Sequence, residues 1–162
     1  MKFSIHDEVK VKELLKENKF PAFRYGQIEN AVYKNYITDF SEIQTIPKEL
    51  RQLLSENCFY QSLSIDHEAT SSNGQTTKFL FKTEDNLLIE AVIMRHLSGR
   101  NTLCISCQAG CPMACTFCAT WKLGLQKNLS MYEVVEQVMY AAKLLDSEWK
   151  KLRNIVFMGM GE

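Results

Sequence analysis

Five of the chain's six cysteines lie within fifteen residues, in the segment CISCQAGCPMACTFC. Gly110 and Pro112 disfavour a regular helix there, so a loop is expected. This concentration of thiols constrains the fold, because clustered cysteines in a reducing compartment more often serve as metal ligands or catalytic thiols than as structural disulfides. The five are Cys104, Cys107, Cys111, Cys115 and Cys118.

The N-terminus indicates such a compartment. Its first twenty residues, MKFSIHDEVKVKELLKENKF, are rich in charge and lack the apolar core of a secretory signal. No run in the chain approaches the roughly 18 apolar residues of a membrane span. We therefore expect a cytoplasmic protein without a membrane partner, whose thiols stay reduced.

Three groupings of the clustered thiols can be drawn. Cys104 and Cys107 form one C-x2-C pair and the last two cysteines form another, but these pairs lie closer than the roughly 15–20 residues usual in a four-thiolate zinc site. A redox pair is the second grouping, although five thiols exceed what thiol–disulfide exchange needs. The third is C-x3-C-x2-C, made by Cys111, Cys115 and Cys118, on an iron–sulfur cluster. Three thiolates would leave one iron of a four-iron cluster open to chelate a small molecule.

The cysteine segment is expected between a strand and a helix. NTLCISC, at 101–107, reads as a short strand that enters the loop. Ser130 and Glu133 have the spacing of a capping box, which predicts a helix to about Leu145. NIVFMGMGE then reads as a buried strand, 154–158, that runs into a glycine-rich loop. A strand, a helix and a strand in this order predict a β-α-β unit with a parallel sheet.

Two further regions precede this unit. Residues 1–57 carry three apolar stripes of helical period and predict a helical accessory domain, either a plain bundle or a dedicated RNA-binding module. Residues 58–98 change to a period of two, as in TTKFLFKT, and predict a β-meander of about three strands. With residues 99–162 as the third region, the expected fold class is α/β.

Glu90 is the one charged residue in LLIEAVIM, the last strand expected in the meander. It shares a side of that strand with Leu88, Val92 and Met94, so we expect a desolvated carboxylate with a raised pKa, as in a general base. The alternative is a structural glutamate that reaches solvent or pairs with an arginine.

Local charge is a second feature of the cysteine region. The whole chain balances 19 basic against 19 acidic residues, yet no Asp or Glu occurs within 91–132. Arg95, Arg100, Lys122 and Lys127 all fall in this tract. We therefore expect a locally basic surface that attracts an anion.

The motif C-x3-C-x2-C, with Phe117 directly before its last cysteine, resembles that of the radical S-adenosylmethionine (SAM) enzymes. TLCISCQAGCPMACTFCAT, LGLQKNLS and NIVFMGMGE narrow the resemblance to the radical SAM RNA adenine C2-methyltransferases, which modify 23S ribosomal RNA and transfer RNA. These segments are also similar to the sister C8-methyltransferases of antibiotic resistance. The likeness continues upstream through IEAV and FRYGQIENAVYKNYITDFSEIQTIPKELR, so it covers nearly the whole chain.

The resemblance implies a fold and two cofactor sites. The fold is a helical accessory domain and a β-meander, followed by the first β-α-β unit of a partial (β/α) barrel. The implied ligands of a 4Fe-4S cluster are Cys111, Cys115 and Cys118. Gly161 and Glu162, in the glycine-rich stretch, match the residues that bind the amino group of SAM.

The resemblance also implies two catalytic residues. In the family, one SAM methylates a cysteine near the C-terminus, and a second SAM yields a 5′-deoxyadenosyl radical that takes hydrogen from this methyl group before its carbon adds to adenine. Glu90 matches the glutamate proposed to accept the ring proton. Cys104 matches the cysteine that releases the methylated RNA by forming a disulfide. Cys107 stands where Ser is usual, so it is expected to be a spare thiol.

The implied partners are 23S rRNA, tRNA and a flavodoxin-like electron donor, and the implied enzyme is a monomer. The chain stops directly after the glycine loop, so we expect a fragment, inactive alone, that lacks the rest of the barrel and the methyl-carrying cysteine. C8 methylation, a zinc-binding RNA module and a thiol redox protein are the alternatives.

Two tryptophans stand where glycine is expected. Trp121 lies where the family typically has Gly, beside the cysteine loop, and Trp149 lies in the turn after the expected helix, a natural place for a glycine cap. We hypothesise that both are UGA codons, which some bacterial lineages read as glycine.

Overall fold

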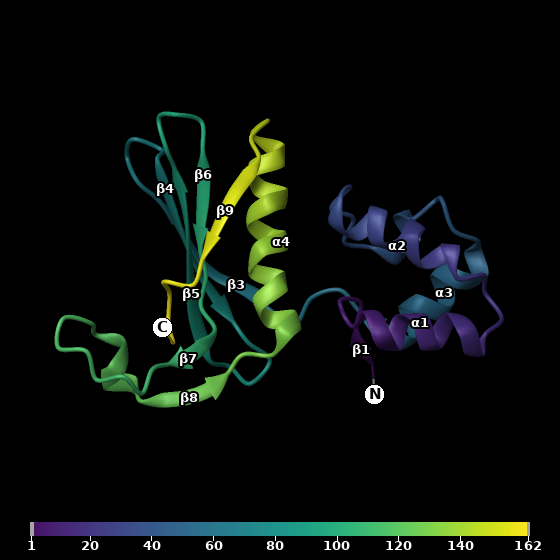
Figure 1. Cartoon of the computed structure of the whole chain (residues 1–162), viewed down its shortest axis with the longest axis horizontal. Helices are drawn as coiled ribbons and strands as arrows, with labels where there is room; N and C mark the ends of the chain where they lie inside the picture. The colour runs from purple at the N-terminus through teal and green to yellow at the C-terminus, as the bar shows by residue number, and fades with distance from the viewer. Residues whose placement is uncertain (1, 162) are drawn as a thin grey trace. The chain divides into compact units, whose positions relative to one another are not determined.

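The computed structural model describes residues 2–161. The chain divides into two compact units, Met1–Gln61 and Ser62–Glu162. The first is mainly helical, and the second is a mixed sheet with one long helix (Figure 1). No described helix is long and apolar enough to cross a membrane.

Helices build most of the first unit. Each one buries the apolar stripe that its sequence period predicts, with Val11, Ile28 and Leu50 among the buried side chains. Its helices are α1 (Glu8–Glu17), α2 (Phe23–Tyr33), the short η1 (Phe40–Glu42) and α3 (Lys48–Asn57). A short parallel pair, β1 (Phe3–Ser4) with β2 (Cys58–Phe59), completes this unit.

Among the described residues of the second unit, five strands form one mixed sheet in the order β3-β4-β5-β6-β9. Neighbours are antiparallel except for β6 and β9, which are parallel. The meander and the parallel pair therefore share one sheet, because β6 pairs with β5 on one side and with β9 on the other. The strands are β3 (Ser64–Thr70), β4 (Thr76–Lys82), β5 (Leu88–Arg95), β6 (Asn101–Cys104) and β9 (Leu152–Val156).

The helix α4 (Met131–Ser147) packs along one face of this sheet (Figure 1). Tyr140 meets the rings of Phe79 and Phe81 edge-on, with centroids 5.2 and 5.4 Å apart. These contacts place the core between α4 and the side of β4 and β5 that the period of two predicts to be apolar. β6, α4 and β9 thus form the β-α-β unit that the sequence predicts.

The predicted start of α4 is confirmed, whereas the predicted burial of the last strand is not. The expected capping box is present, because the side chains of Ser130 and Glu133 each accept a hydrogen bond from the other's backbone N–H. The expectation of a buried strand at 154–158 is wrong. β9 spans Leu152–Val156 and lies at the sheet edge, where its middle residues 153–155 are exposed. An apolar run predicts a strand, but its burial depends on a neighbouring strand that the described residues do not supply.

A small hairpin carries the cysteine loop. β7 (Gln108–Gly110) pairs antiparallel with β8 (Leu125–Asn128), and the short helix η2 (Thr120–Leu123) lies within the loop between them. Strands of three and four residues are too short to show an alternating pattern, so the sequence did not predict this hairpin. The pairing of β7 with β8 closes the base of the cysteine loop, and the hairpin follows the end of β6.

Candidate cofactor and active site

The backbone closes the cysteine loop at its base. The N–H of Cys111 donates to the carbonyl of Gly124 at 3.1 Å, where the loop leaves β7 and returns to β8. Gly110 has a φ of +73°, and a Cβ there would lie 1.8 Å from the Gly124 oxygen, so this position requires glycine. The loop between Cys111 and Gly124 is therefore anchored at both ends.

The three cysteines of the motif lie on this loop. Cys111 is buried, whereas Cys115 and Cys118 are partly exposed, and the Cys118 N–H donates to the Cys115 carbonyl at 3.1 Å. Hydrogen bonds from the side chain and backbone of Thr120 lower the pKa of the Cys118 thiol, which favours the thiolate that a metal requires. All six cysteines of the chain are described, and none forms a disulfide.

The donor chemistry of the loop fits a thiolate-ligated cluster. Three unbridged thiols stand within 111–118, in a stretch of sequence without carboxylates that could compete with them. Within the described part of the chain, however, no three His, Cys, Asp or Glu side chains are gathered closely enough to hold a metal ion. A cluster would therefore have to draw the loop together as it binds, which is the usual coupling of metal binding to folding.

The glycine-rich stretch docks on the segment between β6 and β7. The N–H of Met160 donates to the Ser106 hydroxyl at 2.9 Å, and the Met160 carbonyl accepts from the N–H of Cys107 at 3.0 Å. A Cβ on Gly159 would lie 2.6 Å from the carbonyl oxygen of Ile105. Glycine is therefore needed here because backbone packs directly against backbone.

Gly161 lies beside the start of β7. Its φ is +97°, and a Cβ there would come within 2.5 Å of the Gln108 side chain. The thiol of Cys107 donates to the Gly161 carbonyl at 3.2 Å, so this expected spare thiol holds the glycine loop. The candidate SAM-binding glycine is therefore adjacent to the strand that leads into Cys111. Glu162, its expected partner in binding SAM, lies outside the described residues.

The two expected catalytic residues share the sheet face opposite α4. In the β5–β6 register Cys104 stands opposite Val92, and Glu90 lies two residues from Val92 on the same side of β5. Diagonal neighbours of this kind are about 7–8 Å apart. The structure therefore brings these two residues onto one surface, although 13 other residues separate them in the sequence.

The expected burial of Glu90 is wrong. Its side chain is 42% exposed and pairs with the Nζ of Lys78 on β4 at 2.5 Å. α4 covers only the face that carries Ile89 and Ile93, so the apolar residues around Glu90 line an uncovered face. A strand with apolar residues on both sides need not have two buried sides. The arrangement matches the alternative of a solvent-reaching glutamate, with a lysine in place of the arginine.

The basic tract is partly neutralised by acids from elsewhere in the chain. Arg95 pairs with Glu148 at 2.5 Å. Lys127 pairs with Asp85 at 2.6 Å and with Glu133 at 2.9 Å. Asp85 lies in the β4–β5 turn, Glu133 in α4 and Glu148 directly after α4, all outside the tract. The positive charge that the folded chain offers to an anion is therefore smaller than the sequence predicts.

Comparison with known proteins decides the family. No family model matches the chain. It is 44% identical over 158 residues to the probable dual-specificity RNA methyltransferase RlmN of Corynebacterium glutamicum, a match that covers 98% of the chain and 43% of that protein. It is 40% identical over 154 residues to the ribosomal RNA large subunit methyltransferase Cfr of Bacillus velezensis, covering 95% of the chain and 43% of that protein.

A solved structure agrees with these relatives. The radical SAM methyltransferase from Sphaerobacter thermophilus matches with a TM-score of 0.91 and 36% identity, over 99% of this chain and 47% of that one. Over the part that it spans, the chain belongs to the RlmN/Cfr family of radical SAM RNA methyltransferases. It spans less than half the length of these relatives.

In this family member, α4 carries polar residues that sequence reasoning missed. Gln137 is fully buried and bonds both the N–H and the carbonyl of Ser106, each at 3.0 Å. Glu136 is buried and accepts from the N–H groups of Ser62 and Leu63, each at 2.8 Å. The helical period could have indicated their burial, because it places them on the side of the helix that buries Ala141 and Leu145. Their polar side chains, taken alone, predict exposure to solvent instead. The buried polar residues of α4 are Glu133, Glu136 and Gln137.

Proposed function

We propose that this chain is the cluster-binding part of a radical SAM enzyme that methylates C2 of an adenine in 23S rRNA and tRNA. The observation that carries the proposal is the arrangement around β6: the glycine loop docks on the segment that leads from β6 into the cysteine hairpin, and Cys104 of β6 and Glu90 of β5 share the open face of the sheet. Its relatives include both RlmN and Cfr proteins, which supports RNA methylation. We choose C2 over C8 because the housekeeping C2-methyltransferases are the commoner enzymes.

Two sets of residues would hold the cofactors. Cys111, Cys115 and Cys118 would supply three thiolates to a 4Fe-4S cluster, which when bound provides the electron that cleaves SAM. Gly161 keeps its backbone uncovered by a side chain, and Cys107 fixes its carbonyl, so this turn can present backbone groups to the amino group of SAM. A flavodoxin-like protein would supply the electron.

The open face of the sheet would handle the RNA. Glu90 is accessible there and would accept the ring proton, while Lys78 holds its carboxylate in place. Cys104, on the neighbouring strand, would attack the sulfur of the cysteine that bridges to the RNA. A disulfide would form as the bond between that sulfur and the transferred carbon breaks, which would release the methylated RNA. Because α4 does not cover this face, an adenine taken out of its stack has access to both side chains.

The cluster assignment is tested by reconstituting the 162-residue chain with iron and sulfide without oxygen. We expect about four iron atoms per chain and a broad visible absorbance. Single changes of Cys111, Cys115 or Cys118 to Ala should each abolish iron binding. Cys107→Ala and Cys58→Ala, which remove thiols outside the motif, are the matched controls and should retain iron binding.

Two results would contradict the assignment. Iron retained when all three motif cysteines are replaced would show that the cluster ligands lie elsewhere. One colourless zinc ion per chain, bound by the wild type under the same conditions, would favour a zinc-binding RNA module.

The RNA step is tested in a complete relative, RlmN of C. glutamicum. Alanine at the cysteine equivalent to Cys104 should trap a covalent RNA–protein adduct, because no thiol remains to resolve it. Free methylated RNA formed at the wild-type rate would exclude that role. Liquid chromatography of the nucleosides from the wild-type reaction, against 2-methyladenosine and 8-methyladenosine standards and with detection by mass spectrometry, separates C2 from C8 methylation.

A further inference from the structure

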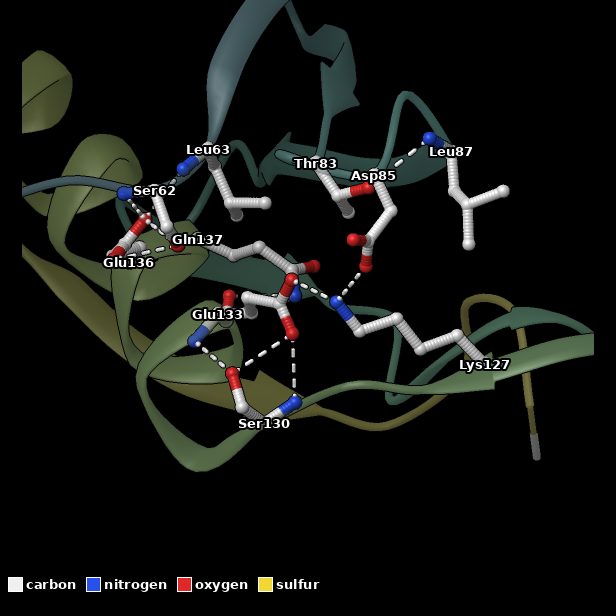
Figure 2. A network of polar contacts seen from close by, with 10 residues as sticks. All are labelled: Ser62, Leu63, Thr83, Asp85, Leu87, Lys127, Ser130, Glu133, Glu136 and Gln137. Carbon is white, nitrogen blue, oxygen red and sulfur yellow. Dashed lines mark hydrogen bonds and ion pairs between the residues drawn. The ribbon is translucent and has the colours of Figure 1, made fainter. Parts of the chain in front are cut away.

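The first two turns of α4 contact the chain on both sides of the cysteine hairpin. Figure 2 shows the polar side chains of these turns beside Lys127 of β8 and Asp85 of the β4–β5 turn. Such buried polar groups are costly unless they are satisfied, so their partners are under strong constraint. The partners of Gln137 lie where the chain enters the hairpin, and Lys127, a partner of Glu133, lies where it leaves.

The entry to the hairpin is fixed by Gln137. Its Nε2 donates to the Ser106 carbonyl and its Oε1 accepts from the Ser106 N–H, both at 3.0 Å, two residues before β7. The Ser106 hydroxyl in turn donates to the Glu90 carbonyl at 2.7 Å and accepts from the Met160 N–H at 2.9 Å. The buried carboxamide of Gln137 therefore fixes Ser106, and Ser106 in turn helps to position both β7 and the glycine loop.

The exit from the hairpin is fixed by Lys127. Its Nζ lies 2.9 Å from the Glu133 carboxylate and 2.6 Å from the Asp85 carboxylate. The Glu133 side chain is 2% exposed and also accepts from the N–H of Ser130 at 2.8 Å. Just beyond β8, the N–H of Leu129 donates to the Cys107 carbonyl at 2.9 Å, which ties the exit to the entry.

Lys127 is the cation that makes the buried Glu133 tolerable. A carboxylate at this depth is stable when it is paired and hydrogen-bonded, and removing its cation leaves a buried charge without compensation. The lysine stem also spans from β8 to α4, so the ion pair is a mechanical link as well as an electrostatic one. Breaking it would therefore loosen the β8 end of the hairpin.

We propose that Gln137 and the Lys127–Glu133 pair are positioning residues that clamp both ends of the β7–β8 hairpin to α4. The clamp sets the spacing across which Cys111, Cys115 and Cys118 must gather around a cluster. That consequence rests on the proposed function. The clamp itself is a property of the metal-free chain and can be tested without iron.

Hydrogen exchange followed by mass spectrometry tests the clamp in the metal-free 162-residue chain. In Lys127→Met and in Gln137→Leu, amides within 107–129 should exchange about tenfold faster or more, because buried charged or doubly bonded contacts are lost. Amides of β4 and β5 should exchange as in the wild type. Lys150→Met is the matched control, because Lys150 pairs with Glu148 beyond the other end of α4.

Two more variants separate positioning from a general loss of folding. Lys127→Arg keeps the ion pair and should restore slow exchange. Lys127→Met combined with Glu133→Gln leaves no unpaired buried charge and keeps a side chain that can complete the capping box, so it should fold yet still exchange quickly in the hairpin. Wild-type exchange across 107–129 in this double variant would overturn the inference.

Iron reconstitution of the same variants connects the clamp to the cluster. We expect Lys127→Met and Gln137→Leu to retain less than half the iron of the wild type and to change the electron paramagnetic resonance spectrum of the reduced cluster, with Lys150→Met unchanged. Full iron with an unchanged spectrum, despite faster exchange, would overturn the positioning role. If the wild type takes up no iron while the variants still exchange faster, the proposed function fails and the clamp stands.

Discussion

Trp149 occupies a backbone position that suits glycine. It follows the end of α4 with a φ of +58°, and its N–H donates to the Asp146 carbonyl at 2.9 Å while the N–H of Lys150 donates to the Leu145 carbonyl at 2.8 Å. This is the left-handed turn that commonly ends a helix with glycine. Trp121, in contrast, lies within η2 and is not among the described residues with positive φ.

Replacing Trp149 with glycine should stabilise the chain. The left-handed conformation costs a non-glycine residue about 1 kcal/mol, and the indole is 99% exposed, so few contacts are lost in exchange. Urea unfolding should show a gain of about 1 kcal/mol for Trp149→Gly. Trp149→Ala keeps the backbone cost and should show no such gain; an equal gain in both variants would place the effect in the indole instead.

The codon hypothesis for the two tryptophans remains a prediction. The backbone at Trp149 agrees with a glycine there, whereas the backbone at Trp121 does not require one. The gene sequence decides between the possibilities. UGG codons at both positions would reject the hypothesis.

Glu136 should make stability depend on pH. Burial raises its pKa from 4.5 to about 7, although the N–H groups of Leu63 and Ser62 that donate to it act in the opposite direction. A folded-state pKa above the unfolded one means that the native chain holds the proton more tightly. This residue's contribution is therefore most favourable below pH 4.5, and it declines as the pH rises from 4.5 to about 7.

The variant Glu136→Gln isolates this effect. Its stability relative to the wild type should rise through that window by up to about 1.4 kcal/mol per pH unit, because the variant has no proton to lose. The comparison cancels the opposing contribution of His6, whose pKa burial lowers to about 4. Chemical unfolding at several pH values measures the stability difference between Glu136→Gln and the wild type, with Glu13→Gln at an exposed position as control. Parallel curves for Glu136→Gln and the wild type would exclude the titration.

At the scale of elements, the glycine loop depends on close backbone contact. A methyl group on Gly159 would meet the Ile105 carbonyl at 2.6 Å and the Ser106 hydroxyl at 2.7 Å. Gly159→Ala should therefore destabilise the chain by about 1–3 kcal/mol, as other overpacked sites do. Gly26→Ala, in α2 with nothing within 4 Å, is the matched control and should stabilise by about 0.5–1 kcal/mol. Thermal unfolding of both variants tests the contrast, and a neutral Gly159→Ala would mean that the loop can shift away.

At the scale of the whole molecule, we expect the described edge of the sheet to promote aggregation. β9 is an edge strand, and its Ile155 is 46% exposed, with Phe157 and Met158 exposed after it. Unpaired backbone beside apolar side chains recruits further strands. Ile155→Lys should therefore raise the temperature at which light scattering begins. Leu97→Lys adds the same charge at an exposed turn away from β9, and an equal rise there would assign the effect to net charge.

Local chemistry was readable from the sequence. The period of two around Phe79 and Phe81, the helical stripes of α1 to α3, and the capping box at Ser130 each depend on neighbours within a few residues, and the structure contains all of them. The cysteine motif and the glycine stretch likewise indicated the family, because their spacing is a local property. The hairpin that carries the motif was missed, since its strands are too short for any period.

Burial and charge pairing were decided only by the tertiary structure. Glu90 is accessible because α4 covers one face of the sheet, and β9 is exposed because it lies at an edge of that sheet. Lys127 was predicted to be part of a basic surface, but its charge is paired with the carboxylates of Asp85, 42 residues before it, and Glu133, six residues after it. Gln137 became a core residue through a contact 31 residues away. Spacing within a few residues sets local conformation, whereas solvent exposure and charge partners are set by segments that meet only when the chain folds.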